Sequence, residues 1–391
     1  MADLDFAREL DLFTGPDAIA MLWAAATGTP GQAPPGFAAE MIDLHYRPGS
    51  ETTALYEVTI GDAVEFFGAT TADVGGQVAT LTGDGMTVRV WRHPDDPRLP
   101  GFAQTCDPDT VGGWLDALEP EPEPGSDAEC EWHVETLTYR PLRRAVLRAN
   151  RGDTTYFIKV VRPDRVEPLA DRHRLIADAG LGVPVVARPA PGVLITPELV
   201  GSPLSDRLAA GEAPSLAELL AALRQIPAAA LALPARPGWP EILGFHTDTA
   251  VAQLPDSERR IRDAANAIAA VLSVAPTGPP IPAHGDFYEA NIFVTQAGLR
   301  FIDVDSVGPG LLEDELACLL GHGWVLPAFD ERYAAVERVV SSWQSDAEQL
   351  VDPAALRARV AAVVLSLISG ADDAQARSRL VLAERFAAGS R

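Results

Sequence analysis

A group of polar residues between positions 284 and 305 has the types and the spacing that phosphoryl transfer requires. Asn291 follows Asp286 by five residues, and an apolar strand pair then leads to Asp303. One carboxylate can orient an attacking hydroxyl and accept its proton, while an amide oxygen and a second carboxylate can hold Mg²⁺ on nucleotide phosphates. A loop followed by a hairpin would bring these three side chains around one point. The alternative is a surface turn rich in Asp and Asn that precedes an ordinary hairpin.

Lys159 is the only lysine of the chain, and it lies in an apolar segment at residues 155–161. This segment follows a turn at residues 150–153, which is typical of the second strand of a hairpin. A compact ammonium group on a flexible stem can reach nucleotide phosphates, and arginine does not replace it well there. We therefore predict that Lys159 contacts phosphate. The alternative is that a chain rich in Ala, Arg and Pro has kept one lysine by drift.

The composition indicates a globular protein of two or three domains. Hydrophobic residues make up 47% and charged residues 22% of the 391 positions, which are ordinary values. No apolar run reaches membrane-spanning length and the first residues are not basic, so we expect a cytoplasmic protein. Cys106, Cys130 and Cys318 share no metal-ligand spacing, and we expect them to be reduced.

The formal net charge of the chain is −24. Such acidity argues against nucleic acids and anionic membranes as partners. It fits either a cationic ligand or a solvated acidic surface. The sequence does not indicate an oligomeric state.

The first third of the chain is predicted to form a separate accessory domain, residues 1–128. A helix is expected at residues 16–26, strands between residues 42 and 91, and a short helix at residues 109–118. An acidic, Pro-rich run at residues 119–127 is typical of a linker or an exposed loop.

The rest of the chain is predicted to form two lobes. Residues 129–201 contain three expected strands, a helix at residues 168–179 and two short strands. Residues 202–391 are mainly helical, apart from a β-rich patch at residues 282–307. Strands with one helix, followed mostly by helices, favour a two-lobed architecture.

With these motifs the sequence resembles the aminoglycoside phosphotransferase and choline kinase-like superfamily. The resemblance covers roughly Trp132 to the C-terminus, and it rests on these segments: His284-Gly285-Asp286 with Asn291, Ile302-Asp303, Gly308-Pro309-Gly310 and Glu315-Leu316-Ala317. It implies an α+β, bilobal protein-kinase-like fold with a β-rich N-lobe and a mainly helical C-lobe. A small α/β cap-like domain would precede this fold.

The resemblance also implies roles for the residues that match its motifs. Asp286 would be the catalytic base, Asn291 and Asp303 the Mg²⁺ ligands, and Lys159 a contact to the α- and β-phosphates of ATP or GTP. His284 would be a structural hydrogen-bonding residue of the loop.

Further nucleotide contacts are expected from the helix after the lysine and from the hinge. Asp171 would pair with the lysine, and Glu167, four residues earlier on the same helical face, is the alternative. The Pro197 carbonyl and the Leu199 amide could pair with the purine edge.

The loop between the first two strands of the predicted N-lobe has no glycine. Backbone cradling of phosphate is therefore restricted there. Arg143 or Arg144 would contact phosphate instead, and an exposed arginine pair is the alternative.

The acceptor is predicted to bind between the catalytic loop and the C-terminal helices. Carboxylates combined with tryptophan suit an amino sugar through charge pairing, ring stacking and cation–π contact. The candidate residues are Glu289, Asp314 and Trp324. For each of them alone, a helix surface or a core position is the alternative.

The leading hypothesis is a Mg²⁺-dependent O-kinase whose acceptor is a hydroxyl of a sugar, an amino sugar or an aminoglycoside-like compound. A choline- or homoserine-type metabolite kinase is one alternative, and a non-catalytic nucleotide-binding scaffold is another. The intact set of lysine, two aspartates and asparagine argues against the scaffold. A protein kinase is not expected, because Gly285 stands where protein kinases usually have arginine.

Overall fold

The computed structural model describes residues 11–28, 31, 33–34, 36–46, 51–76, 78–83, 86–119 and 131–389. The chain divides into two compact units, each made of two segments. The first unit comprises Met1–Ala170 and Val185–Glu198, and the second comprises Asp171–Pro184 and Leu199–Arg391. The predicted finer division at residues 128 and 201 stays a prediction.

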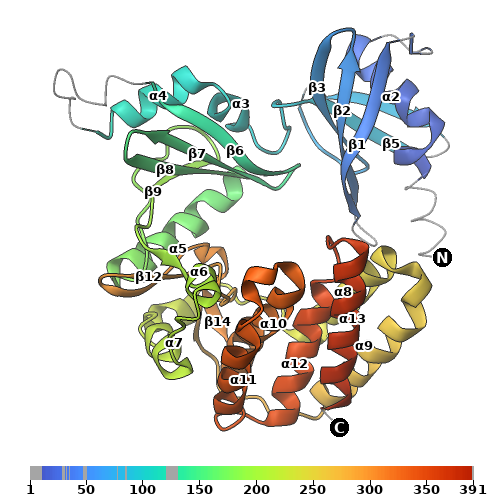
Figure 1. Ribbon diagram of the computed structural model, residues 1–391. Helices are drawn as coiled ribbons and strands as arrows, with labels where there is room; N and C mark the ends of the chain where they lie inside the picture. Colours follow the sequence, from blue (N-terminus) through green and yellow to red (C-terminus); the bar gives the residue numbers. More distant parts are fainter. Residues whose placement is uncertain are drawn as a thin grey trace. The chain divides into compact units, whose positions relative to one another are not determined.

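The N-terminal part of the first unit is an antiparallel sheet with the strand order β1-β2-β3-β5-β4 (Figure 1). Alternate residues of β2, such as Tyr56 and Val58, are buried, as expected for a strand with one covered face. The covering core includes Leu22 of helix α2 (Pro16–Thr27). The strands are β1 (Phe37–Tyr46), β2 (Thr52–Ile60), β3 (Ala63–Thr70), β4 (Ala79–Gly83) and β5 (Met86–Arg92).

A second sheet in the first unit has the strand order β6-β7-β8-β9. One face is covered by the short helices α3 (Phe102–Thr105) and α4 (Pro108–Asp116), whose apolar residues share a core with Leu147 and Ile158. The strands are β6 (His133–Arg140), β7 (Arg144–Arg151), β8 (Thr154–Val161) and β9 (Val193–Pro197).

The second unit is a helical bundle around α10 (Leu312–Phe329) and α12 (Pro353–Ser366). Most residues of helix α12 are buried, and it packs against α8, α9, α10 and α13, as expected for a helix in the centre of a core. A Cβ atom on Gly321 would lie 2.6 Å from Val363, so glycine permits the close approach of the two central helices. The other helices are α6 (Leu204–Ala209), α7 (Leu216–Leu223), α8 (Trp239–Gln253), α9 (Glu258–Leu272), α11 (Val336–Ala347) and α13 (Asp373–Ala388).

Short strands in the second unit flank the segments that contain the predicted catalytic and Mg²⁺-binding residues. A three-stranded sheet has the order β10-β12-β13, and β11 pairs with β14. All these pairs are antiparallel. The strands are β10 (Ser202–Pro203), β11 (Ile281–Ala283), β12 (Ile292–Thr295), β13 (Gly298–Phe301) and β14 (Gly308–Gly310).

The predicted α+β fold class is confirmed, with β-sheets in the N-terminal portion and a helical C-terminal part. The predicted helices at residues 16–26 and 168–179 are α2 and α5 (Val166–Asp178). The short strand expected near residue 187 is only an isolated bridge to Ile195. Apart from Glu119, the predicted acidic linker lies outside the described residues.

Two further expectations concern the cysteines and the membrane. Cys106 and Cys318 are free thiols, and Cys130 lies outside the described residues. Within the described ranges, no helix combines the length and the apolar character needed to cross a membrane.

Candidate active site

The loop at residues 284–291 connects β11 to β12 and is folded tightly against the segment after β13. Gly285 has φ +83°, and a Cβ atom there would lie 2.6 Å from the Ser306 carbonyl oxygen. Both the left-handed backbone and the close approach require glycine at this position. The Gly of the sequence motif therefore sets the path of the loop.

His284 is a buried structural residue of this loop. Its Nε2 lies 3.0 Å from the Ile302 carbonyl oxygen, and its Nδ1 lies 3.3 Å from the Asp286 amide nitrogen. A neutral imidazole with Nε2 protonated satisfies both contacts. Burial lowers the pKa of His284, which favours this neutral form. The side chain links the loop to the strand that precedes Asp303, as the sequence led us to expect.

Glu315, in the first turn of α10, anchors the same loop. Its carboxylate accepts hydrogen bonds from the backbone N–H groups of His284 and Gly285, both at 2.8 Å. Burial raises the pKa of Glu315 to about 7. In the sequence, Glu315 stands out only as part of a family motif. Its function as an anchor depends on a contact across 30 residues of chain, which no local pattern reveals.

The Asp286 carboxylate is held from two sides. Ser306 Oγ donates to Oδ2 at 2.7 Å, and Arg236 Nη1 donates to Oδ1 at 2.6 Å. Arg236 also donates to the Gly285 carbonyl oxygen. The Asp286 side chain is 32% exposed, so a reactant can reach it. Arg236 lies in the segment before α8 and belongs to no motif, so it was not among the predicted site residues.

Asn291 lies beside the residue that precedes Asp303. Its Nδ2 donates to the Asp286 carbonyl oxygen at 3.0 Å, and its own carbonyl accepts from the Ile302 N–H at 3.0 Å. The side-chain amide nitrogen is thus occupied, which leaves Oδ1 as an oxygen ligand. The backbone of Asn291 is therefore bonded to the residue that directly precedes Asp303, the second predicted Mg²⁺ ligand.

Asp303 adopts a left-handed backbone, with φ 50° and ψ 54°. This conformation is uncommon for a residue other than glycine and is typical of functional sites. Within the described residues, no three His, Cys, Asp or Glu side chains form a metal-binding cluster. A Mg²⁺ ion held here would need phosphate oxygens and water as its other ligands, which is usual for this ion.

Asp286 lines a cavity of about 200 Å³ in the second unit. Other lining residues are Arg236, Trp239, His246, Asp314 and His322. The volume is below the range of about 300–1,000 Å³ that is usual for ligand pockets. The cavity therefore suits a small acceptor.

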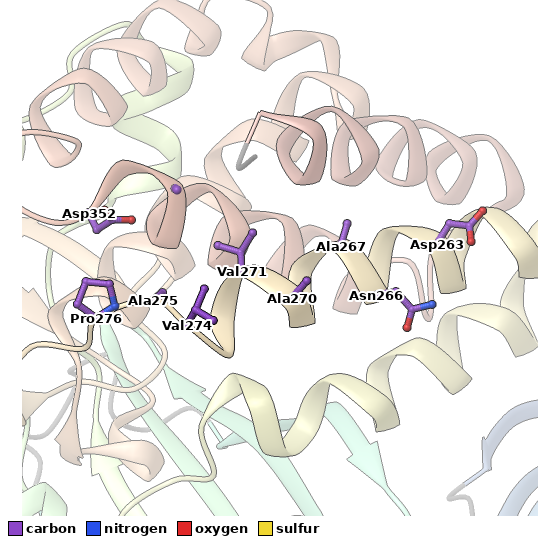
Figure 2. A pocket seen from close by; sticks show the side chains of 10 residues that line it. Asp263, Asn266, Ala267, Ala270, Val271, Val274, Ala275, Pro276 and Asp352 are labelled. Carbon is purple, nitrogen blue, oxygen red and sulfur yellow. The ribbon is translucent and has the colours of Figure 1, made fainter.

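A larger hollow of about 830 Å³ lies along α9 and the start of α12 (Figure 2). Its lining comes mainly from α9 and the segment that follows it, including Ala267, Ala270 and Val274, and Asp352 also contributes. None of the predicted site residues lines it. Since it contains no group of the predicted chemistry, we place the candidate active site at the smaller cavity.

Only one of the three predicted acceptor contacts lines the cavity. Asp314 does, and it accepts from Arg359 Nε at 2.9 Å. Glu289 is buried, and one of its oxygens has no hydrogen-bond partner in the described parts of the chain. Trp324 donates its Nε1 to Gln344 at 2.9 Å. The assignments of Glu289, Asp314 and Trp324 to the acceptor stay predictions.

Lys159 lies on β8 between Val146 of β7 and Leu194 of β9. Its neighbours Ile158 and Val160 are fully buried in the core on the opposite face of the sheet. The face that carries Lys159 also carries Val161 and Leu194, which pack with Leu169 of α5. Helix α5 therefore covers the lysine face of the sheet, which limits the directions available to the side chain.

The predicted carboxylate partners of Lys159 each bind an arginine. Asp171 accepts from Arg174 at 2.7 Å, and Glu167 accepts from Arg188 at 2.6 Å. The choice between Asp171 and Glu167 stays open. Of the predicted purine contacts, Pro197 is the last residue of β9, and Leu199 lies two residues beyond it, outside any helix or strand.

The turn between β6 and β7 is held by Asp96. This carboxylate accepts from the Leu142 N–H at 2.7 Å and from the Tyr139 hydroxyl at 2.9 Å. Leu142 has φ 63°, a left-handed backbone conformation that is unfavourable for leucine. The hydrogen bonds to Asp96 hold the turn in this conformation. Arg143 is exposed at this turn, and its contact with phosphate stays a prediction.

His322 of α10 stacks on Tyr288 of the loop at residues 284–291, with ring centroids 4.0 Å apart. Burial lowers the pKa of His322 to about 4, whereas an unfolded histidine has a pKa of about 6.5. At a pH between these two pKa values, the histidine is protonated in the unfolded state but not in the folded state. The free energy of unfolding therefore falls as the pH drops through this window, by about 2 kcal/mol between pH 7 and pH 5.

His322→Phe is expected to remove this contribution while it keeps an aromatic ring against Tyr288. Urea unfolding at pH 7 and pH 5 should show a smaller loss of stability for the variant, by about 1–3 kcal/mol. Tyr288→Phe retains the imidazole and should keep the pH dependence of the wild type. Equal pH dependence of His322→Phe and the wild type would show that another group titrates.

An α+β fold with a β-rich part and a helical part is that of the protein-kinase-like superfamily. Residues 142–350, more than half of the chain, match the phosphotransferase enzyme family. The chain belongs to that family. A comparison with curated protein sequences gives no match.

Similar solved structures include two of a thermostable mutant of the aminoglycoside phosphotransferase APH(4)-Ia. The apo form is 14% identical with a TM-score of 0.50, and the match covers 66% of this chain and 95% of that one. The ternary complex with AMP-PNP and hygromycin B is 13% identical with a TM-score of 0.50, and the match covers 71% and 98%. A choline kinase from Cryptosporidium parvum Iowa II is 13% identical with a TM-score of 0.49, over 72% and 96%. The APH(4)-Ia structures share the fold of this chain.

Proposed function

We propose that this protein transfers the γ-phosphate of ATP or GTP to a hydroxyl of a small acceptor, either a sugar, an amino sugar or an aminoglycoside-like compound. The observation that carries the proposal is the arrangement around Asp286. Its carboxylate is fixed by Ser306 and Arg236, it faces a cavity, and its backbone carbonyl fixes the Asn291 amide. Family membership supports the reaction class.

In this proposal Asp286 acts as the general base. It orients the acceptor hydroxyl and takes up its proton while the hydroxyl oxygen forms a bond to the γ-phosphorus. The bond between the γ-phosphorus and the β,γ-bridging oxygen breaks, and the nucleoside diphosphate leaves with the electron pair. Ser306 and Arg236 keep the carboxylate in place, so little reorganisation is needed during the reaction.

Asn291 and Asp303 would hold Mg²⁺. The occupied amide nitrogen of Asn291 supports this assignment, because the remaining group of that side chain is an oxygen. When bound, Mg²⁺ neutralises charge on the nucleotide phosphates.

Lys159 would contact the α- and β-phosphates, with either Asp171 or Glu167 as its carboxylate partner. The Pro197 carbonyl and the Leu199 amide would bind the purine edge, and Arg143 would contact phosphate. The presence of AMP-PNP in the APH(4)-Ia complex supports the use of a nucleotide. Acceptor contacts are proposed for Glu289, Asp314 and Trp324.

The proposal is tested by thermal shift with ATP or GTP, each with and without Mg²⁺, followed by phosphate-transfer assays on amino sugars, neutral sugars, aminoglycosides and amino alcohols. A ligand that binds only the folded state must raise the melting temperature. We expect stabilisation by a nucleotide with Mg²⁺ and transfer to one class of acceptor. A folded protein that responds to neither nucleotide would contradict the proposal and favour the scaffold alternative.

A further inference from the structure

The guanidinium of Arg236 is fixed beside Asp286 but retains unused hydrogen-bond donors. Nη1 donates to Asp286 Oδ1 at 2.6 Å and to the Gly285 carbonyl oxygen. Arginine has five N–H donors. The donors on Nε and Nη2 have no hydrogen-bond partner among the residues that the structure describes. Arg236 also lines the cavity and is 48% exposed, so a ligand can reach these donors.

The acidic side chains of the cavity already have partners. Asp286 is paired with Arg236, and Asp314 is paired with Arg359, which is only 4% exposed. Both oxygens of Glu315 accept backbone N–H groups. A polycationic acceptor would therefore have to break existing ion pairs to gain new ones.

The two histidines of the cavity add no positive charge near neutral pH. Burial lowers the pKa of His246 and brings the pKa of His322 to about 4. The remaining charged donors that line the cavity are thus those of Arg236. A planar guanidinium with a free pair of donors is well suited to bind a carboxylate.

We propose that Arg236 binds a carboxylate of the acceptor, so that the acceptor is a small hydroxy acid. The inference rests on the proposed phosphoryl transfer and replaces its acceptor class with hydroxy acids, sugar acids included. Because one nitrogen of the guanidinium contacts Asp286, a carboxylate held by the Nε and Nη2 edge lies close to the base. A hydroxyl a few bonds away on the same molecule can then reach Asp286.

The shape of the cavity agrees with an acceptor of about the size of a monosaccharide. Its volume is about 200 Å³. Trp239 and His246 form one part of the lining, with ring centroids 5.6 Å apart. These rings can cover the apolar face of a sugar ring.

The test uses matched acceptors with Mg²⁺ and ATP or GTP. Glucuronate is compared with glucose and glucosamine, and L-homoserine with 3-aminopropan-1-ol, which lacks only the carboxylate. We expect kcat/KM to be about 10-fold or more higher for the acceptor with the carboxylate in at least one set. Preference for glucose or glucosamine would overturn the inference and leave the proposed function intact. Preference for the amino alcohol would overturn the inference and favour the metabolite-kinase alternative.

Arg236→Gln should lower kcat/KM for the preferred carboxylate acceptor by about 10- to 100-fold, mainly through KM. The loss should be smaller with the matched acceptor that lacks the carboxylate, and Arg236→Lys should recover part of it. An equal loss on both members of the pair would show that Arg236 only positions Asp286, and would overturn the inference.

Arg260→Gln is the matched control, because Arg260 forms an exposed ion pair with Glu384 at 2.6 Å on the helical surface. It should leave the preference between acceptors unchanged. Melting temperatures of all variants establish that they are folded. If the wild type neither responds to nucleotide nor transfers phosphate to any acceptor, the proposed function fails, and this inference fails with it.

Discussion

Replacing Asp286 with asparagine is expected to slow phosphoryl transfer by about 10²- to 10⁴-fold, the usual contribution of a general base. Asparagine has nearly the same shape: its Oδ1 can still accept from Arg236, and its Nδ2 can donate to the Ser306 hydroxyl oxygen, so the loop should keep its path. It cannot take up the proton of the attacking hydroxyl. The loss should therefore appear in kcat, while nucleotide affinity, measured by thermal shift with Mg²⁺, should change little.

Asp248→Asn is the matched control for this change. Asp248 lies on α8, where it forms an ion pair with Arg262 at 3.2 Å, and the same substitution there should not affect transfer. A comparable loss of nucleotide binding and of turnover in Asp286→Asn would argue against the base assignment. It would indicate that the carboxylate holds the nucleotide or the fold of the loop instead.

The candidate site residues that could be predicted from the sequence lie together in one short segment of the chain. Asp286, Asn291 and Asp303 lie within 18 residues. A tight loop and a hairpin are local structures, so their spacing constrains where these side chains meet. The structure brings Asn291 to Asp286 and next to the residue before Asp303 in this way.

The supporting residues depend on contacts between distant segments. Arg236 reaches Asp286 across 50 residues, and Glu315 reaches the loop from the next long helix. No local period or motif specifies such pairs, because they arise only when the helices pack. The sequence therefore indicated the candidate base but not the residues that hold its carboxylate in place.

Helical geometry explains why Trp324 does not line the cavity. Asp314, Cys318 and His322 of α10 line it at intervals of four residues, which places them on one face of the helix. Trp324 is two residues beyond His322, a rotation of about 200°. It packs instead with Phe386 and Gln344. The period of the helix could have excluded Trp324 from the cavity lining once one residue of the lining face was known.

Replacing Lys159 with alanine is expected to lower kcat by about 10²- to 10³-fold, the usual loss when one fixed charged donor to a developing phosphate charge is removed. Alanine is compatible with the fold of β8, because the strand core is formed by Ile158 and Val160 on the other face. Nucleotide affinity should weaken as well, since the proposed contact is already present before transfer. Steady-state kinetics and thermal shift with Mg²⁺ and nucleotide measure the two effects separately.

Two further variants serve as comparisons for Lys159→Ala. Lys159→Arg keeps the positive charge but replaces a compact ammonium with a planar fork, and it should recover little of the lost activity. Arg148→Ala removes a cation from β7, where it pairs with Glu135 at the surface, and it should leave turnover unchanged. If Lys159→Ala retained the kinetics of the wild type, phosphate binding by this residue would be rejected. The only lysine in a chain rich in arginine would then be a residue kept by drift, and the phosphate charge would have to be neutralised by arginine instead.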